Sequence, residues 1–329
     1  MTNVLVNERG AVLINKLLSI DGHENSISRV VTHAHSDHIR DLDKSLTTCK
    51  NLVGTPLTLD WLVELGYKIP RDYSIRLDYG SRVSIGELKL ELVKTLHIPG
   101  SSQVVVTDED GLKIVYTSDF KKPGVHTPIL EADILVLDAV YGNPNYVREF
   151  DEYIEDILTD LVNQLLSKGP VVIYGYHGKL QEVMKIFRDR GIIAPYVLPP
   201  KVYGMTKIAE KYDLRIRDYV LLGSSEGAEV VKSGWFLLFT HVSSSNYMRG
   251  LRASEVLLSG WEFKKPYRYL GSNRWLVAFS DHADFKGLIH YIINSNPKTI
   301  IVNSVRSSYS EIFANEVRRI TKKECIVMP

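Results

Sequence analysis

The stretch Val30–His38 constrains this chain more than any other, because metal-binding side chains crowd into it. It places three histidines and one aspartate within six residues: His33, His35, Asp37 and His38. An apolar strand over 28–32 leads into it, so the first two histidines point the same way while the chain is extended. The last two side chains follow where the chain bends into a helix. Imidazole and carboxylate are ligands that zinc favours, so the pattern predicts a metal site, and a double one.

Three later apolar strands also end in a histidine or an aspartate. The strands over 88–93, 112–116 and 134–137 are followed by His97, Asp119 and Asp138. Functional groups gather where strands end in open α/β sheets. The sequence therefore predicts a sandwich of sheets whose strand ends surround one metal-bearing cleft. Asp21 ends a strand just before the histidine stretch, and it either forms a turn or orients a ligand histidine.

Length and charge set the remaining limits. At 329 residues the chain predicts two domains, or one domain with a large insertion. A formal net charge of +1 gives no global attraction to nucleic acid. The two cysteines have no partner spacing, and the chain shows neither a membrane span nor a signal-peptide pattern. We expect a cytoplasmic protein that does not enter the membrane.

From residue 143 the sequence pattern changes to predicted strands that alternate with predicted helices, which indicates a separate α/β subdomain. The polar segment 242–250 follows a buried strand of this region. It contains Ser244 and Arg249, and it is either a phosphate-binding loop or a plain connection. Lys179 begins a helix after another buried strand.

These motifs resemble the metallo-β-lactamase superfamily, and the long insert with Asp138 and with His282 in 280–284 resembles its β-CASP nuclease group. Similarity is greatest to the ligase-associated DNA exonucleases of that group, and it covers the whole chain. It implies an α/β fold: an αββα sandwich formed by 1–142 and 256–329, with a β-CASP domain inserted at 143–255.

The resemblance also implies roles for individual residues. His33, His35 and His97 are expected to bind a first zinc, Asp37 and His38 a second, and Asp119 both. Asp138 is expected to orient His282, which acts as a general acid, while Asp21 supports the ligands from behind. Lys179, Ser244 and Arg249 are expected to contact the substrate. We expect two zinc sites, the second weaker, with manganese able to replace zinc.

One departure bears on the substrate. RNA-processing members carry a metal-binding histidine where this chain has Asn303, or Val302 if the alignment shifts by one residue, whereas DNA-processing members commonly lack it. We therefore predict a nuclease, an exonuclease on single-stranded DNA, in which Asn303→His strengthens the second metal site. The alternatives are an RNA-processing nuclease, a small-molecule metallo-hydrolase and a non-catalytic nucleic-acid-binding homologue. Nucleic acid is the expected partner, and a homodimer is an open alternative.

Overall fold

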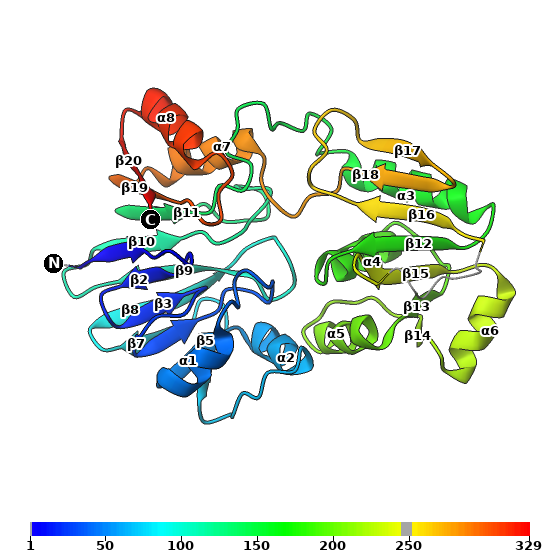
Figure 1. Cartoon of the computed structure of the whole chain (residues 1–329), viewed down its shortest axis with the longest axis horizontal. Helices are drawn as coiled ribbons and strands as arrows, with labels where there is room; N and C mark the ends of the chain where they lie inside the picture. Colours follow the sequence, from blue (N-terminus) through cyan, green and yellow to red (C-terminus); the bar gives the residue numbers. More distant parts are fainter. Residues whose placement is uncertain (1, 245–251) are drawn as a thin grey trace. The chain divides into compact units, whose positions relative to one another are not determined.

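The computed structural model describes residues 2–244 and 252–329, which form two compact units of helices and strands (Figure 1). Unit 1 comprises Met1–Val147 and Asp281–Pro329, and unit 2 comprises Arg148–Ser280. Both units mix helices with sheets, so the predicted α/β class is confirmed. In the described ranges no helix combines the length and the apolar character needed to cross a membrane.

The unit boundaries differ from those expected from the sequence, 1–142, 143–255 and 256–329. The strand Ser254–Leu258 pairs in parallel with a strand of unit 2, for example Val171 with Ser254, and the strands Arg274–Val277 and Tyr267–Gly271 extend the same sheet. They therefore belong to unit 2, and the chain returns to unit 1 only at Asp281. Pairing of this kind joins distant segments, so local sequence texture did not indicate it.

One sheet of unit 1 has the strand order β1-β2-β3-β4-β5-β6. Its strands are β1 (Val4–Val6), β2 (Val12–Ile14), β3 (Leu18–Ile20), β4 (Ser28–Val30), β5 (Asn51–Gly54) and β6 (Ser74–Arg76). β3, β4 and β5 are parallel neighbours, so their carboxyl ends meet at one edge. The histidine stretch leaves the sheet at that edge.

The second sheet of unit 1 has the order β20-β19-β11-β10-β9-β8-β7. Its strands are β7 (Arg82–Ile85), β8 (Leu88–Lys94), β9 (Ser102–Thr107), β10 (Lys113–Tyr116), β11 (Ile134–Leu137), β19 (Thr299–Asn303) and β20 (Glu324–Met328). Side chains alternate between its two faces. Val104 and Val106 pack with residues of the first sheet, whereas Val105 packs with helices.

The helices of unit 1 are α1 (Leu42–Thr48), α2 (Pro56–Glu64), α7 (Phe285–Ser295) and α8 (Ser310–Thr321). Apolar residues of α7 and α8 share a core with the second sheet, while α1 and α2 contact β5 and β6. The start of α7 is fixed by Asp284, whose carboxylate accepts from Gly287 N at 2.9 Å. That cap fixes where the helix begins, directly after His282.

Unit 2 is built on a largely parallel sheet of order β14-β13-β15-β12-β16-β18-β17. Its strands are β12 (Val171–Gly175), β13 (Tyr196–Leu198), β14 (Tyr219–Leu221), β15 (Leu237–His241), β16 (Ser254–Leu258), β17 (Tyr267–Gly271) and β18 (Arg274–Val277). Its helices are α3 (Ile154–Leu166), α4 (Lys179–Asp189), α5 (Pro200–Glu210) and α6 (Ser225–Ser233). The sheet has an apolar core on each face.

Candidate metal centre

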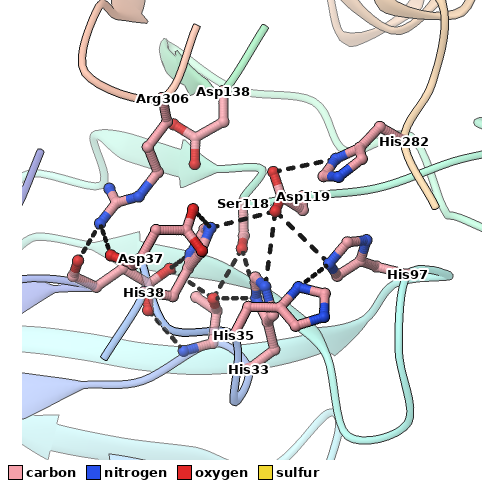
Figure 2. A network of polar contacts seen from close by, with 12 residues as sticks. His33, His35, Asp37, His38, His97, Ser118, Asp119, Asp138, His282 and Arg306 are labelled. Atoms are coloured by element: carbon pink, nitrogen blue, oxygen red, sulfur yellow. Dashed lines mark hydrogen bonds and ion pairs between the residues drawn. The ribbon is translucent and has the colours of Figure 1, made fainter. Parts of the chain in front are cut away.

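The histidine stretch leaves β4 and places its side chains at the buried edge of the first sheet (Figure 2). His33 and His38 are completely buried, whereas half of the Asp37 side chain, 53%, is exposed. His97 follows β8 and Asp119 follows β10, so the second sheet supplies the opposing ligands. The predicted convergence of strand ends is therefore present within unit 1.

A first group of potential ligands consists of His33, His35, His97 and Asp119. One ligand atom from each lies within 4.8 Å of the others. The Nε2 atoms of His33 and His97 are each 3.6 Å from Asp119 Oδ2. Burial lowers the pKa of His97 to about 3 and holds that of His33 well below its usual value. Both rings are therefore neutral, as metal ligands must be.

A second group, Asp37, His38 and Asp119, shares its last member with the first. His38 Nε2 lies 3.3 Å from Asp37 Oδ2 and 3.2 Å from Asp119 Oδ2. Burial alone lowers the pKa of His38, but the carboxylates of Asp37 and Asp119 outweigh it and raise that pKa well above its usual value. A cation is thus strongly favoured at this point, and a metal ion would supply one in place of the proton.

Two ring nitrogens give an independent test of whether these residues fit a metal. The Nε2 atoms of His33 and His38 are buried and have no hydrogen-bond partner among the described residues. Such orphaned polar atoms are rare in native interiors. Both face the Asp119 carboxylate, so a divalent ion would satisfy them, and the residues fit the implied metal. Nothing in the geometry selects zinc over manganese.

Asp21 lies behind the second group. It follows β3 and adopts a positive φ of 52°, a turn conformation. Its Oδ2 lies 2.8 Å from His38 Nδ1, and its Oδ1 accepts from Thr32 N at 2.8 Å. A carboxylate on the far nitrogen directs Nε2 towards the metal position. If Asp21 orients a ligand histidine, as one of the two sequence-based interpretations has it, this contact with His38 is the one required.

His282 and Asp138 lie beside Asp119 from two other segments. His282 Nδ1 is 3.5 Å from Asp119 Oδ1, and 23% of the His282 side chain is exposed. The Asp138 carboxylate accepts from the Tyr116 hydroxyl. Burial raises the pKa of Asp138 to about 6, against the lowering effect of the Arg306 charge. The expected orientation of His282 by Asp138 stays a prediction, since the contact described here for His282 is with Asp119.

Two buried arginines next to the ligands were missed by the sequence analysis. Arg29 stands in β4 itself, and Arg306 follows β19 and is labelled in Figure 2. A basic residue in the middle of the ligand strand was a usable signal for Arg29. Arg306 had no such signal, because its neighbours come from remote segments.

The predicted substrate contacts fall in unit 2. Lys179 is buried at the start of α4 after β12, and Ser244 follows the parallel neighbour β15. Aromatic rings lie at the same edge: His241 is 4.7 Å from His177 and 5.3 Å from Tyr176 between centroids. Carboxyl ends of parallel strands form ligand crevices in open α/β sheets. Arg249 lies outside the described residues.

Comparisons with known proteins find relatives that are named as nucleic-acid enzymes. No family model matches it. A protein of Acidianus ambivalens described as "Uncharacterized protein in lig 3'region" is 46% identical over 138 residues, which cover 42% of this chain and 99% of that protein. A probable DNA ligase of Opitutus terrae is 22% identical over 86% of this chain and 27% of the ligase. RNase aCSPSF2 of Saccharolobus solfataricus is 29% identical over 58% of this chain and 43% of its own length.

The chain thus spans less than half of those two longer relatives. Further relatives are named transcription termination factor FttA, probable RNase MJ4 and RNase J-like protein. Among solved structures, a protein of unknown function from Enterococcus faecalis superposes with a TM-score of 0.61 at 15% identity, over 92% of this chain and 79% of that one. That likeness concerns the fold alone.

Proposed function

We propose that this chain, which belongs to the β-CASP nuclease group of the metallo-β-lactamase superfamily, is a metal-dependent nuclease that hydrolyses phosphodiester bonds in single-stranded DNA. In this proposal unit 1 is the αββα metallo-β-lactamase sandwich and unit 2 is the β-CASP insert. The observation that carries the activity is the pair of ligand groups joined by Asp119, with buried ring nitrogens facing it.

His33, His35, His97 and Asp119 would hold one ion, and Asp37 and His38 would hold a second together with Asp119. Ions bound there would supply a hydroxide at neutral pH and would polarise the phosphoryl oxygens. Asp37 is the exposed member of the ligand set, so its side of the centre is open to substrate. We expect zinc as the native ion, with manganese able to replace it.

His282 then serves as the proton donor. A water molecule that has lost one proton to solvent attacks phosphorus as hydroxide, the bond from phosphorus to the sugar oxygen breaks, and the sugar oxygen takes a proton from His282, which solvent then replaces. Because Nδ1 of the ring faces Asp119, Nε2 is the atom that donates. A histidine charges near neutral pH, which suits a general acid of this kind.

Unit 2 supplies substrate contacts in this proposal. Lys179 and Ser244 bring a cation and a hydroxyl to one edge of its sheet, and Tyr176 adds a ring that is 53% exposed. Charge that follows the backbone, combined with rings that stack on bases, is typical of single-strand binding. Arg249 is proposed for the same role.

The choice of DNA rests on two features. Asn303 stands where RNA-cutting members carry a metal-binding histidine, and one relative over most of this chain is named a probable DNA ligase. The alternative, an RNA nuclease, is supported by the RNase names of the other relatives. Both alternatives use the same metal centre.

Matched oligonucleotides test the proposal. DNA and RNA of one sequence, single- and double-stranded and labelled at either end, are incubated with zinc-loaded, manganese-loaded and metal-free protein. We expect single-stranded DNA to be degraded fastest, one end to be preferred, and the metal-free protein to be inactive. Faster cleavage of RNA would establish the alternative, and cleavage without metal would contradict the whole proposal.

A further inference from the structure

The carbonyl groups of two consecutive ligand residues are each held by a buried arginine. Arg29 Nη2 donates to His38 O at 3.1 Å, and Arg306 Nη2 donates to Asp37 O at 3.0 Å. The two arginines come from opposite ends of the chain, from β4 and from the segment after β19. The main chain at Asp37 and His38 is therefore held at two successive carbonyls, one by each arginine.

Arg29 connects the His38 carbonyl to the segment that follows in the chain. Its side chain is completely buried, and its Nη1 also donates to Arg40 O at 3.0 Å and to Ser45 Oγ at 2.9 Å. Burial lowers the pKa of Arg29 to about 10, so the guanidinium stays charged at neutral pH. Arg29 thus connects the ligand turn to the start of α1.

Arg306 connects the Asp37 carbonyl to two earlier segments of the chain, at Gly10 and at Asp21. Its guanidinium also donates to Gly10 O and Asp21 O, and only 9% of the residue is exposed. Figure 2 shows Arg306 beside the Asp138 carboxylate. Burial opposes its charge, but Tyr116 and the carboxylates nearby outweigh burial and raise its pKa. The side chain is therefore a permanent cation.

Burying two guanidinium groups is expensive, and an apolar replacement often stabilises a protein more. Arginine offers a planar fork of donors in a fixed geometry, which holds several carbonyls in defined directions at once. Lysine, a flexible point charge, cannot reproduce that fork. Both guanidinium groups bond to the main chain of ligands of the second group, Asp37 and His38, so holding these ligands in place would explain why the arginines are buried.

We propose that Arg29 and Arg306 are positioning residues that hold the main chain of Asp37 and His38 so that both side chains face Asp119, and that they thereby set the affinity of the second metal position. This proposal rests on the metal centre proposed above. It assigns the difference in affinity between the two positions to main-chain geometry as well as to the ligands present. The carbonyls that these two hydrogen bonds hold belong to ligands of the second group, so we expect the first position to depend on the arginines much less.

Zinc titrations of metal-free Arg29→Lys and Arg306→Lys, with a competing chelator dye, test the proposal. Loss of a group that orients a ligand typically lowers metal affinity about 10–100-fold. We expect a loss of that size at the weaker position and less than about threefold at the tighter one. Asp37 and His38 themselves are left in place in both variants.

Arg188→Lys is the matched control. Arg188 of unit 2 also donates to several carbonyls, among them Ala194 O and Asp218 O at 3.0 Å, but it lies outside unit 1. We expect this variant to lose thermal stability comparably while keeping both zinc affinities. Unchanged affinity at the weaker position in both test variants, or equal losses at both positions, would overturn the proposal.

The result is separable from that of the nuclease assay. Two zinc affinities that respond as expected, in a protein that cuts no nucleic acid, would leave the positioning role standing and refute the proposed activity. If either test variant fails to fold, the other still decides, because the two arginines hold different carbonyls, His38 O and Asp37 O.

Discussion

Unit 1 and unit 2 differ most in what they bury. Unit 2 packs helices and parallel strands around apolar side chains such as Leu158, Phe187 and Phe239. Unit 1 has apolar cores of its own, yet it also buries a connected set of ionisable groups at one sheet edge. They are Asp21, Arg29, His33, His38, His97, Asp119, Asp138 and Arg306.

Such groups are costly to bury unless each is paired, and several of these are paired only if a cation lies among them. Apolar burial stabilises by roughly 25 cal/mol per Å² whatever the pH or the metal content. The comparison therefore teaches that the edge of unit 1 is built for chemistry at the expense of stability, while unit 2 is a self-sufficient scaffold. The predictions below test this contrast, beginning with the largest effect.

Asp119→Ala should lower the cleavage rate by at least about 10⁴-fold. That is the upper end of the loss expected from removing a single acid–base group. Asp119 is the member shared by both ligand groups, so its loss weakens both metal positions together. Metal content by mass spectrometry and initial cleavage rates measure the effect. Asp133→Ala is the control, because that carboxylate of unit 1 pairs with Lys298 at 2.8 Å. Wild-type metal content in Asp119→Ala would mean that the buried set is not a metal site.

His282→Ala should lower the cleavage rate about 10²–10⁴-fold while metal content and substrate affinity stay near wild type. The reason is that the ring is partly exposed beside Asp119 and absent from the three potential ligand groups of the described residues. His290→Ala, an exposed histidine on the following helix, is the matched control and should behave as wild type. Loss of metal from His282→Ala would instead make His282 a ligand and enlarge the buried set.

The same contrast explains what could be predicted from sequence. The candidate ligands that the structure brings together could be picked out from sequence, because the spacing within 33–38 and the strand ends at His97 and Asp119 are local signals. Arg306 was not, since its partners Gly10 and Asp21 lie 296 and 285 positions away. The extent of unit 2 was missed for the same reason, because β16 joins it by pairing with β12, a partner distant in sequence, and β18 and β17 extend the sheet from β16.

The metal-free protein should lose stability as the pH falls below about 6.5. Burial lowers the pKa of His33, His35 and His97, the last to about 3, so the unfolded chain binds protons that the folded chain refuses. Stability from these rings is complete above the unfolded pKa and is lost as the pH falls below it, and for His97 the loss continues down to about pH 3. Each such ring lowers the unfolding free energy by about 1.4 kcal/mol for every pH unit of acidification. His38, whose pKa is raised, acts in the opposite direction and offsets one of the rings.

Thermal unfolding in chelator from pH 7 to pH 5 measures this slope, and His97→Asn should flatten it by removing one ring. Hydrogen exchange at the same pH values should show amides of unit 1 losing protection before those of unit 2. Equal loss of protection in both units would break the comparison.

Tyr176→Ala should raise KM for single strands about 5–150-fold, equivalent to the roughly 1–3 kcal/mol of one stacked base, with kcat unchanged. The ring is exposed and lies at the carboxyl edge of the unit 2 sheet, beside His241. Tyr153→Ala, another exposed tyrosine of unit 2, serves as the control. A fall in kcat with KM unchanged would give unit 2 a share in the chemistry and contradict its role as a binding scaffold.

Asn303→His is the smallest effect, and its expected sign differs from the sequence-based prediction. The side-chain amide of Asn303 is buried, and both of its polar atoms form hydrogen bonds. Nδ2 donates to Gly10 O at 3.2 Å, and Oδ1 accepts from Val305 N at 3.2 Å. Gly10 O is also a partner of Arg306, so Asn303 belongs to the support of the second metal position.

An imidazole at 303 must displace these two hydrogen bonds, each worth about 1 kcal/mol, and crowd the Arg306 guanidinium. We therefore expect about 1–3 kcal/mol of lost stability and no gain in affinity at the second position. Chemical denaturation and zinc titration of this variant, with Asn303→Asp alongside to keep one acceptor, measure both quantities. Tighter zinc at the second position would restore the sequence-based prediction, because it would mean that the ring reaches the metal despite Arg306.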